Sequence, residues 1–194
     1  MWMKAEQMIK NRAVASGLLL AVFVAVSLLA AAPAHAAATI FEVNSTGDAP
    51  DATLNGVCET VTGNGICTLR AAIQEANANA GADTINFNIP GAGVQTITPA
   101  TNLPAITTEA VTINGYSQPG TSANTLAQGN DAVLLIELDE TSMGGSLTIN
   151  ADGTTVRGLI INGGNTDKIL VAASNVTIAG NFIGVDPTLS LIHI

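Results

Sequence analysis

A repeat of 22 residues is the feature that most constrains how this chain folds. Residues 145–163 and 167–185 align at that shift, so that apolar positions and one glycine superpose. The superposed pairs are Leu147 and Ile169, Ile149 and Val171, Val156 and Ile178, Gly158 and Gly180, Ile160 and Phe182, and Ile161 and Ile183. Each copy contains two short strand patterns, and a turn of small polar residues separates them.

Earlier segments have the same character, at residues 84–89, 111–115 and 133–138, and Val111 and Val133 are again 22 residues apart. Short strands at a constant period, with no long helix between them, predict an all-β fold. The specific prediction is a right-handed parallel β-helix, a solenoid of about 22 residues per coil. An antiparallel sandwich also has short strands and turns, but its loops do not keep a constant register.

Residues 85–188 are long enough for four to five such coils, and each coil adds about 4.8 Å along the axis. The side chains predicted to point inward, together with their partners one period later, are those of Leu147, Ile149, Val156 and Ile160.

The open end of a solenoid exposes apolar side chains and unpaired strand edges, so it needs a cap. Residues 37–84 are predicted to provide this cap, with a first strand at 39–43 and a short capping helix at 68–77. Thr68 suits the N-cap position of that helix. One helical face is apolar and consists of Leu69, Ala72, Ile73 and Ala76.

The first 36 residues have the three parts of a secretory signal peptide. Residues 1–12 carry three positive charges, residues 13–32 carry none, and Ala34 and Ala36 form the small-x-small site that signal peptidase accepts. An uncleaved anchor is the alternative, because an apolar stretch of this length can span a bilayer. We interpret residues 1–36 as a cleaved signal, which predicts a secreted or cell-surface protein with no membrane span after cleavage.

The last six residues, 189–194, do not continue the preceding pattern. They read LSLIHI and resemble the translation of a transposon-end adapter used in sequencing libraries. We interpret them as a non-native, adapter-derived tail, which implies a longer natural protein. A natural hydrophobic end is the alternative.

The segment after residue 36 is acidic, because its cations are Arg70, Arg157 and Lys168 against 14 aspartates and glutamates. Nucleic acid therefore finds no basic surface on it. Residues 37–188 also contain no histidine, which excludes Ser-His-Asp and Cys-His mechanisms from this segment. We assign no catalytic residue to it.

Cys58 and Cys67 are the two cysteines of the chain and lie nine residues apart. In an exported protein a disulfide is the natural interpretation, and closing so short a loop stabilises the fold by roughly 2.5 kcal/mol. A metal pair or two free thiols are the alternatives. A structural zinc site needs four ligands, and no histidine or third cysteine is present to complete one.

Two groups of acidic residues are weak candidates for calcium, a cation that binds carboxylate and amide oxygens. One group is a loop near residue 50, and the other is a strand end near residue 138. An Asx-turn loop and a solvated strand edge explain the same residues, so we predict no cofactor and keep calcium as the weaker alternative. The candidate ligands are Asp48, Asp51, Glu137 and Asp139, with Asn55 and Glu140 beside them.

The two arginines of this segment have specific expected positions. Arg70, on the predicted capping helix, is expected to pair with a carboxylate such as Asp83 and to act as a strut. Arg157 is expected to project outward beside the strand at 133–138 and to meet Glu137 or Asp139.

The predicted helix reads CTLRAAIQEAN at 67–77, follows VNSTGD at 43–48, and precedes GYSQPG at 115–120. These segments resemble the CSLREA family of exported bacterial proteins, in which the helix motif precedes right-handed parallel β-helix repeats. Thr68 replaces a serine of that motif, and Ala71 replaces a glutamate, which removes the expected capping-box partner. The resemblance implies a cell-surface or secreted protein and no particular reaction. The motif positions are Cys67, Thr68, Leu69, Arg70, Ala72, Ile73, Glu75 and Asn77.

Two functional hypotheses follow. The first is an exported scaffold with an adhesive role, whose partners are extracellular polysaccharides or cell-surface ligands. The second is the N-terminal part of a β-helix lyase or hydrolase that acts on acidic polysaccharide through carboxylates. Aromatic platforms for sugars are scarce, and Tyr116, in a turn, is the one expected to be exposed.

Overall fold

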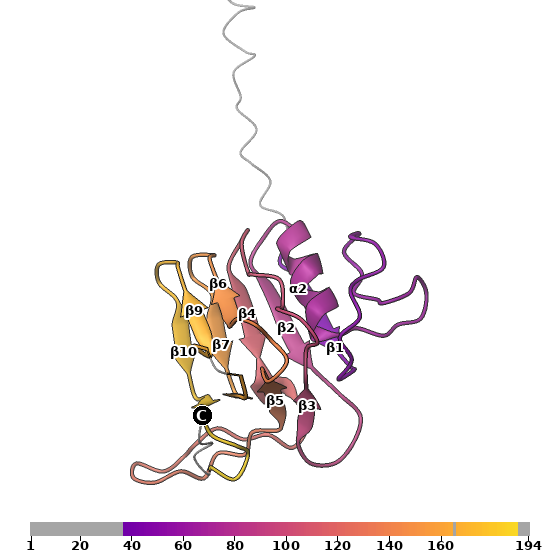
Figure 1. The fold of residues 1–194 in the computed structure, drawn as a ribbon. Coiled ribbons are helices and arrows are strands. Elements are labelled where there is room, and N and C mark those ends of the chain that lie inside the picture. The colour runs from indigo at the N-terminus through magenta and orange to yellow at the C-terminus, as the bar shows by residue number, and fades with distance from the viewer. Residues whose placement is uncertain (1–36, 165, 190–194) are drawn as a thin grey trace, which may run out of the picture. The chain divides into compact units, whose positions relative to one another are not determined.

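The computed structural model describes residues 37–164 and 166–189, and these form mostly parallel β-structure with little helix (Figure 1). The predicted signal, residues 1–36, and residues 190–194 of the predicted tail lie outside the described residues. The strands are β1 (Ile40–Val43), β2 (Asp83–Phe87), β3 (Gln95–Ile97), β4 (Val111–Asn114), β5 (Ile136–Asp139), β6 (Leu147–Ile149), β7 (Thr155–Arg157), β8 (Leu159–Asn162), β9 (Ile169–Val171), β10 (Thr177–Ala179) and β11 (Phe182–Ile183). The helices are α2 (Leu69–Ala78) and the 3-10 turn η1 (Gly115–Ser117).

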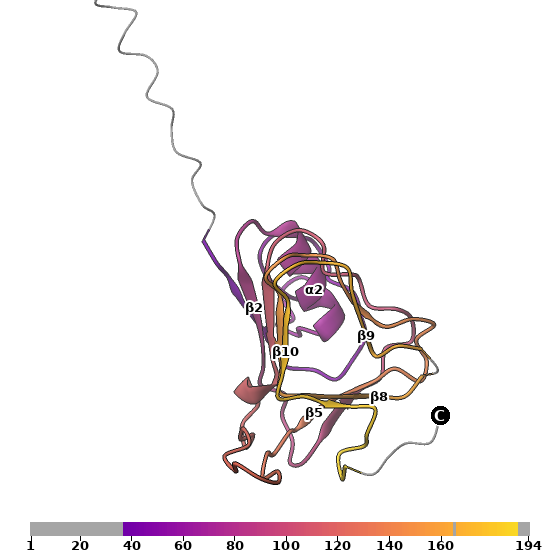
Figure 2. The same ribbon diagram turned by 90° about the vertical axis from the view of Figure 1, so that its left-hand side faces the viewer.

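The strands form three sheets, and every pairing between these strands is parallel. The first sheet has the order β1-β2-β4-β7-β10, the second β11-β8-β5-β3, and the third β6-β9. From β4 to β11 the chain enters the first, second and third sheets in turn and then begins again. Viewed along the stack, the three sheets surround a shared interior (Figure 2).

The 22-residue register is confirmed over the last layers. Val156 pairs with Ile178, Ile160 with Phe182, and Leu147 with Ile169, all at a separation of 22. The prediction that the same period holds over the earlier layers is wrong. Thr84 pairs with Thr112 at a separation of 28, and Thr112 pairs with Thr155 at a separation of 43.

The predicted step from Val111 to Val133 is also not a stacked layer. Val111 pairs with Asp83, while Val133 forms an isolated antiparallel bridge with Ser122. The physical reason is a long loop between η1 and β5, which adds residues to this layer without changing the strands that stack.

The core lies between the three sheets, and it receives alternate side chains of the strands. Leu147, Ile149 and Val156 are buried in it, as predicted. Val171 and Ile178 occupy the corresponding positions of the last described layer and are 40% and 38% exposed.

Ile160 is a correction to the predicted inward set. It is fully buried, but it pairs with Glu137, whereas its neighbours Leu159 and Ile161 pair with the buried Ile136 and Leu138. Because side chains alternate along a strand, Ile160 lies on the opposite face of β8 from the shared interior.

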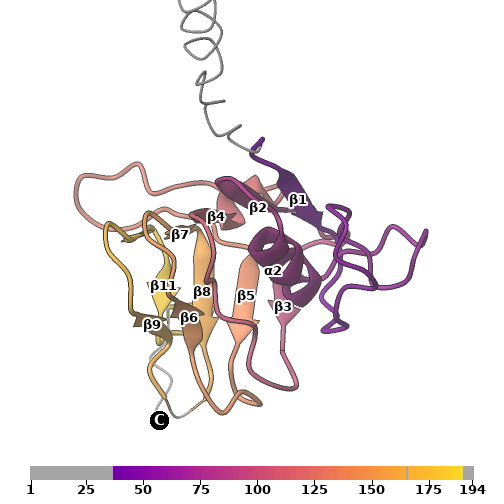
Figure 3. The same ribbon diagram turned by 90° about the horizontal axis from the view of Figure 1, so that it is seen from above.

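Helix α2 lies at the end of the stack formed by β1 and β2 and contacts both strands (Figure 3). Its N-cap is Thr68, whose side-chain oxygen accepts a hydrogen bond from the Ala71 N–H at 3.1 Å. The predicted apolar face is buried, and it consists of Leu69, Ala72, Ile73 and Ala76. β1 adds a strand to the first sheet by pairing with β2, so the boundary expected at 84/85 falls inside β2.

Candidate functional site

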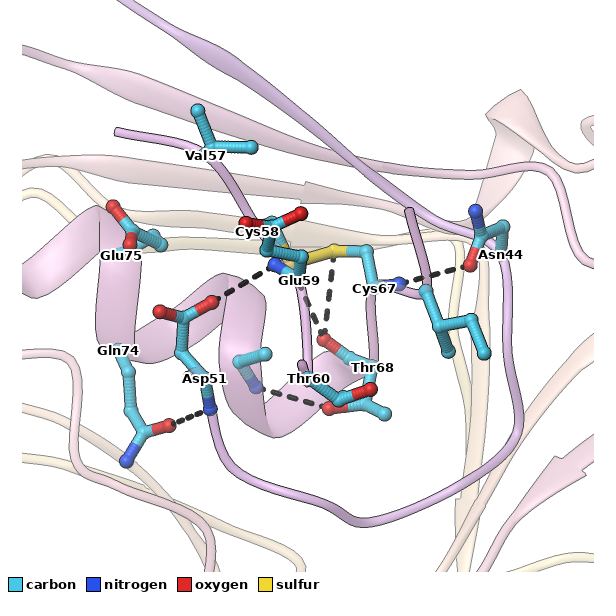
Figure 4. The surroundings of a disulfide bond; sticks show 12 residues. Asn44, Asp51, Val57, Cys58, Glu59, Thr60, Cys67, Thr68, Gln74 and Glu75 are labelled. Carbon is cyan, nitrogen blue, oxygen red and sulfur yellow. Dashed lines mark hydrogen bonds between the residues drawn. A yellow bond between two sulfur atoms is a disulfide. The ribbon is translucent and has the colours of Figure 1, made fainter. Parts of the chain in front are cut away.

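A disulfide anchors the loop that precedes α2 (Figure 4). Cys58 and Cys67 form it, with their Cα atoms 5.2 Å apart. The loop is held to the helix at a second point, because Gln74 Oε1 accepts a hydrogen bond from the Asp51 N–H at 2.8 Å. Asp51 itself accepts the N–H groups of Thr53 and Glu59, both at 2.9 Å. The Asp51 carboxylate is therefore part of the loop's own hydrogen bonding.

Glu75 holds the same loop from the helix side. It is buried and accepts the backbone N–H groups of Asn55 and Gly56 at 3.0 and 2.7 Å. Burial raises the pKa of its carboxyl, and the two backbone hydrogen bonds oppose that rise. This role was missed in the sequence, where Glu75 was only a motif position. Its spacing of three residues from Ala72 on the buried face is the signal that could have revealed it. A pocket of about 240 Å³ beside it is lined by Leu54, Asn55, Gly56, Glu75, Ala78 and Asn79.

Arg70 was predicted to pair with Asp83, but in the structure it pairs with Asp48. Its Nε and Nη2 atoms lie 2.9 and 3.0 Å from the two carboxylate oxygens of Asp48, and its Nη atoms also donate to the carbonyls of Thr101 and Asn102. Asp83 instead accepts from the Thr39 N–H and from the Asn79 side chain. The predicted role of Arg70 as a strut therefore holds with a different carboxylate.

The second group of calcium candidates is likewise occupied by hydrogen bonds. Glu137 and Asp139 share the outward face of β5, as predicted. Glu137 accepts from Thr96 Oγ1 at 2.6 Å and Asn162 Nδ2 at 2.7 Å, and Asp139 accepts from the Thr141 N–H at 2.9 Å. Within residues 37–164 and 166–189 no group of three or more histidines, cysteines, aspartates and glutamates is arranged to hold a metal ion.

Glu140 is not on a solvated turn, as its sequence neighbours suggested, but fully buried. Its Oε1 accepts the Leu147 N–H at 3.1 Å, and its Oε2 lies 3.8 Å from Lys168 Nζ. Lys168 is also buried and donates to the carbonyls of Gly163 and Gly164. Burial raises the pKa of Glu140 to about 7, although Lys168 and the Leu147 N–H oppose this rise. Since no solvent reaches it, this carboxyl cannot touch a ligand.

The outer face of the first sheet carries two in-register rows of polar side chains. The hydroxyl row consists of Thr84, Thr112, Thr155 and Thr177. The amide row runs beside it and consists of Asn86, Asn114 and Arg157. Asn114 Nδ2 donates to Asn86 Oδ1 at 3.1 Å, and Arg157 Nε donates to Asn114 Oδ1 at 2.9 Å. We call these two rows the polar face.

The expectation that Arg157 meets Glu137 or Asp139 is therefore wrong. β7 belongs to the first sheet and β5 to the second, so the outward side chains of the two strands point away from different sides of the stack. The expected rung position is correct, because Arg157 pairs with Ala179.

Tyr116 lies at the edge of the polar face, in η1. Its hydroxyl donates to the Gly180 carbonyl at 2.8 Å. A Cβ atom at Gly158 would come within 2.9 Å of two ring carbons, and one at Gly180 would overlap the hydroxyl, so the ring lies directly on these two stacked glycines. Partial burial raises the pKa of Tyr116, while the positive charge of nearby Arg157 opposes the rise.

No protein-family model, no curated protein and no solved structure matches this chain. The resemblance to the CSLREA family therefore remains a prediction from its motifs. No helix in the part of the chain that the structure describes is long and apolar enough to cross a membrane.

Proposed function

We propose that this chain is an exported parallel β-helix scaffold, secreted or held at the cell surface, with an adhesive role. The observation that carries this proposal is the polar face, where stacked strands repeat hydroxyl and amide groups in register. Each stacked strand adds one residue to each row, so the surface lengthens along the stack, which suits recognition of an extended ligand.

The β-helix itself is supported by the order in which the chain enters the three sheets and by the 22-residue pairings of the last layers. A right-handed coil is expected, because parallel crossover connections are right-handed in nearly all proteins. Helix α2 has the place of a cap, since it covers the end of the stack at β1 and β2 with its apolar face.

Export is supported by the signal-like residues 1–36 and by the pair of cysteines at disulfide distance. We expect the full chain, expressed in a bacterium with an oxidising periplasm, to be recovered outside the cytoplasm and to begin at Ala37. Mass spectrometry of the non-reduced protein should give a mass lower by two hydrogens than that of the reduced protein. Retention of residues 1–36 in the membrane, or two freely alkylated thiols in exported protein, would contradict the proposal.

A polysaccharide lyase or hydrolase is the second candidate, and the exposed Arg157 on the polar face is the observation that favours it. General acid–base catalysis needs a group of suitable pKa within reach of the bond that breaks. The carboxyl whose pKa is about 7, that of Glu140, is buried and out of reach.

We therefore expect the full chain to release no product from polygalacturonate or alginate in the presence of calcium. The measurements are the absorbance of unsaturated products and the formation of reducing ends. Turnover that Arg157→Ala abolishes would place an active site on the polar face and overturn the scaffold proposal.

A further inference from the structure

The positive charges of the described chain are distributed unequally between structural and exposed positions. Arg70 is paired with Asp48, and Lys168 is buried against Glu140. Arg157 is exposed, its Nε donates to Asn114, and neither of its Nη groups has a partner among the described residues. In a segment that has 14 acidic residues, Arg157 is thus the one exposed cation without a carboxylate in residues 37–164 and 166–189.

The amide row fixes the position of this guanidinium. Asn114 donates its Nδ2 to Asn86, so its Oδ1 is turned toward Arg157 and accepts from Nε. A guanidinium held at Nε keeps its Nη donors available in a planar fork, the geometry that matches a carboxylate. Because this hydrogen bond restrains the side chain before a ligand arrives, less conformational entropy is lost on binding.

The neighbours of Arg157 suit the other groups of a sugar, namely its apolar ring face and its hydroxyl groups. Tyr116 presents an aromatic ring that is held in place by Gly158 and Gly180, and aromatic rings pack against the apolar faces of ligands. The hydroxyl row offers donors and acceptors at intervals of about 4.8 Å. Glu42 continues the amide row on β1, where it pairs with Asn86, but no acidic residue lies in either row from β2 to β10. Strands β2 and β4 therefore separate the Glu42 carboxylate from an anion at Arg157.

We propose that the polar face binds an extended carboxylated polysaccharide, with Arg157 holding a uronate carboxylate and Tyr116 packing against an adjoining sugar ring. This inference rests on the proposed adhesive scaffold and names its ligand class and its binding residues. The unpaired guanidinium selects a carboxylate at this one point. Because no other cation lies in the two rows, the remaining contacts of the ligand are to the hydroxyl groups and rings of its sugars.

The test is titration calorimetry of the full chain with polygalacturonate oligosaccharides, with the same oligosaccharides as methyl esters, and with dextran sulfate fragments, which are anionic but carry no carboxylate. We expect binding to polygalacturonate that esterification weakens about tenfold, because the ester removes the charge-assisted hydrogen bonds. Arg157→Gln should weaken binding by a similar factor, and Arg157→Lys should retain part of it. Tyr116→Phe keeps the ring and should bind as the wild type does, whereas Tyr116→Ala should bind more weakly.

Asn130→Asp is the matched control, since it changes the net charge by the same amount at an exposed residue that belongs to neither row of the polar face. It should leave the affinity unchanged. Equal binding of the esters or of dextran sulfate would overturn the carboxylate assignment, and unchanged binding by Arg157→Gln would overturn the site. Binding to none of the three ligands would overturn the ligand class, while recovery of the exported protein still tests the scaffold proposal separately.

Discussion

Gly115→Ala is expected to destabilise the fold by about 3 kcal/mol and to lower Tm by roughly 10 °C. Gly115 is buried where η1 begins, and a Cβ atom there would overlap the carbonyl oxygen of Gly158 and lie 2.8 Å from Leu159 Cδ2. The carbonyl belongs to the backbone between β7 and β8, whose strands are paired on both sides. The obstacle therefore cannot move without disturbing two sheets.

Gly144→Ala is the control for this prediction. Gly144 also has no left-handed backbone angle, but the nearest atom to its Cβ position is Asn102 Oδ1 at 3.9 Å. We expect the free energy of unfolding of Gly144→Ala, measured by thermal and urea denaturation, to stay within about 0.5 kcal/mol of the wild-type value. If Gly115→Ala also has the Tm of the wild type, the close packing of η1 against the backbone after β7 is incorrect.

The stacking of the last layers could be predicted from the sequence because no residues are inserted there. Val156 and Ile178 are 22 residues apart and occupy the same place in adjacent strands. The earlier layers were not predictable in this way, since longer connections from β2 to β4 and from η1 to β5 change the separation without altering the strand pattern. Strand periodicity records which face a residue takes and not how many residues a turn contains.

The capping helix was also predictable, because its N-cap residue and its apolar face are local features. The partners of its polar side chains were not. Arg70 reaches Asp48, and Glu75 reaches Asn55 and Gly56, because the disulfide and Gln74 bring the preceding loop onto the helix. Those contacts depend on tertiary structure that no spacing within the helix describes.

Glu140 shows the same limit at the candidate site. Its neighbours Glu137 and Asp139 remain on the outer face of β5, so an acidic run of this kind reads as a solvated strand end. The backbone of Gly163 and Gly164 from the next layer covers Glu140, and a Cβ atom at Gly164 would come within 2.8 Å of the Glu140 carbonyl oxygen. A segment of the next layer therefore contributes to its burial.

Raising the pH from 5 to 8 is expected to lower the free energy of unfolding, and Glu140 should account for most of the change. Its pKa is about 7 in the folded protein against 4.5 for an ordinary glutamate. Between these values the folded state keeps a proton that the unfolded state has released, so each rise in pH favours unfolding. The stabilisation is complete below about pH 4.5 and is lost as the pH passes 7, a total on the order of 3 kcal/mol.

The groups that face Glu140 determine how each substitution changes the dependence of the unfolding free energy on pH. Glu140→Gln keeps an acceptor for the Leu147 N–H but cannot titrate, so urea denaturation from pH 5 to 8 should give a much flatter profile. Lys168→Met removes the positive charge at 3.8 Å, so the pKa of Glu140 should rise further and the loss of stability should move to higher pH. Glu109→Gln removes an exposed carboxylate and should retain the wild-type slope. Glu75, whose pKa burial also raises, keeps a smaller slope of the same sign in every variant. A wild-type slope in Glu140→Gln would show that the buried pair does not control this pH dependence.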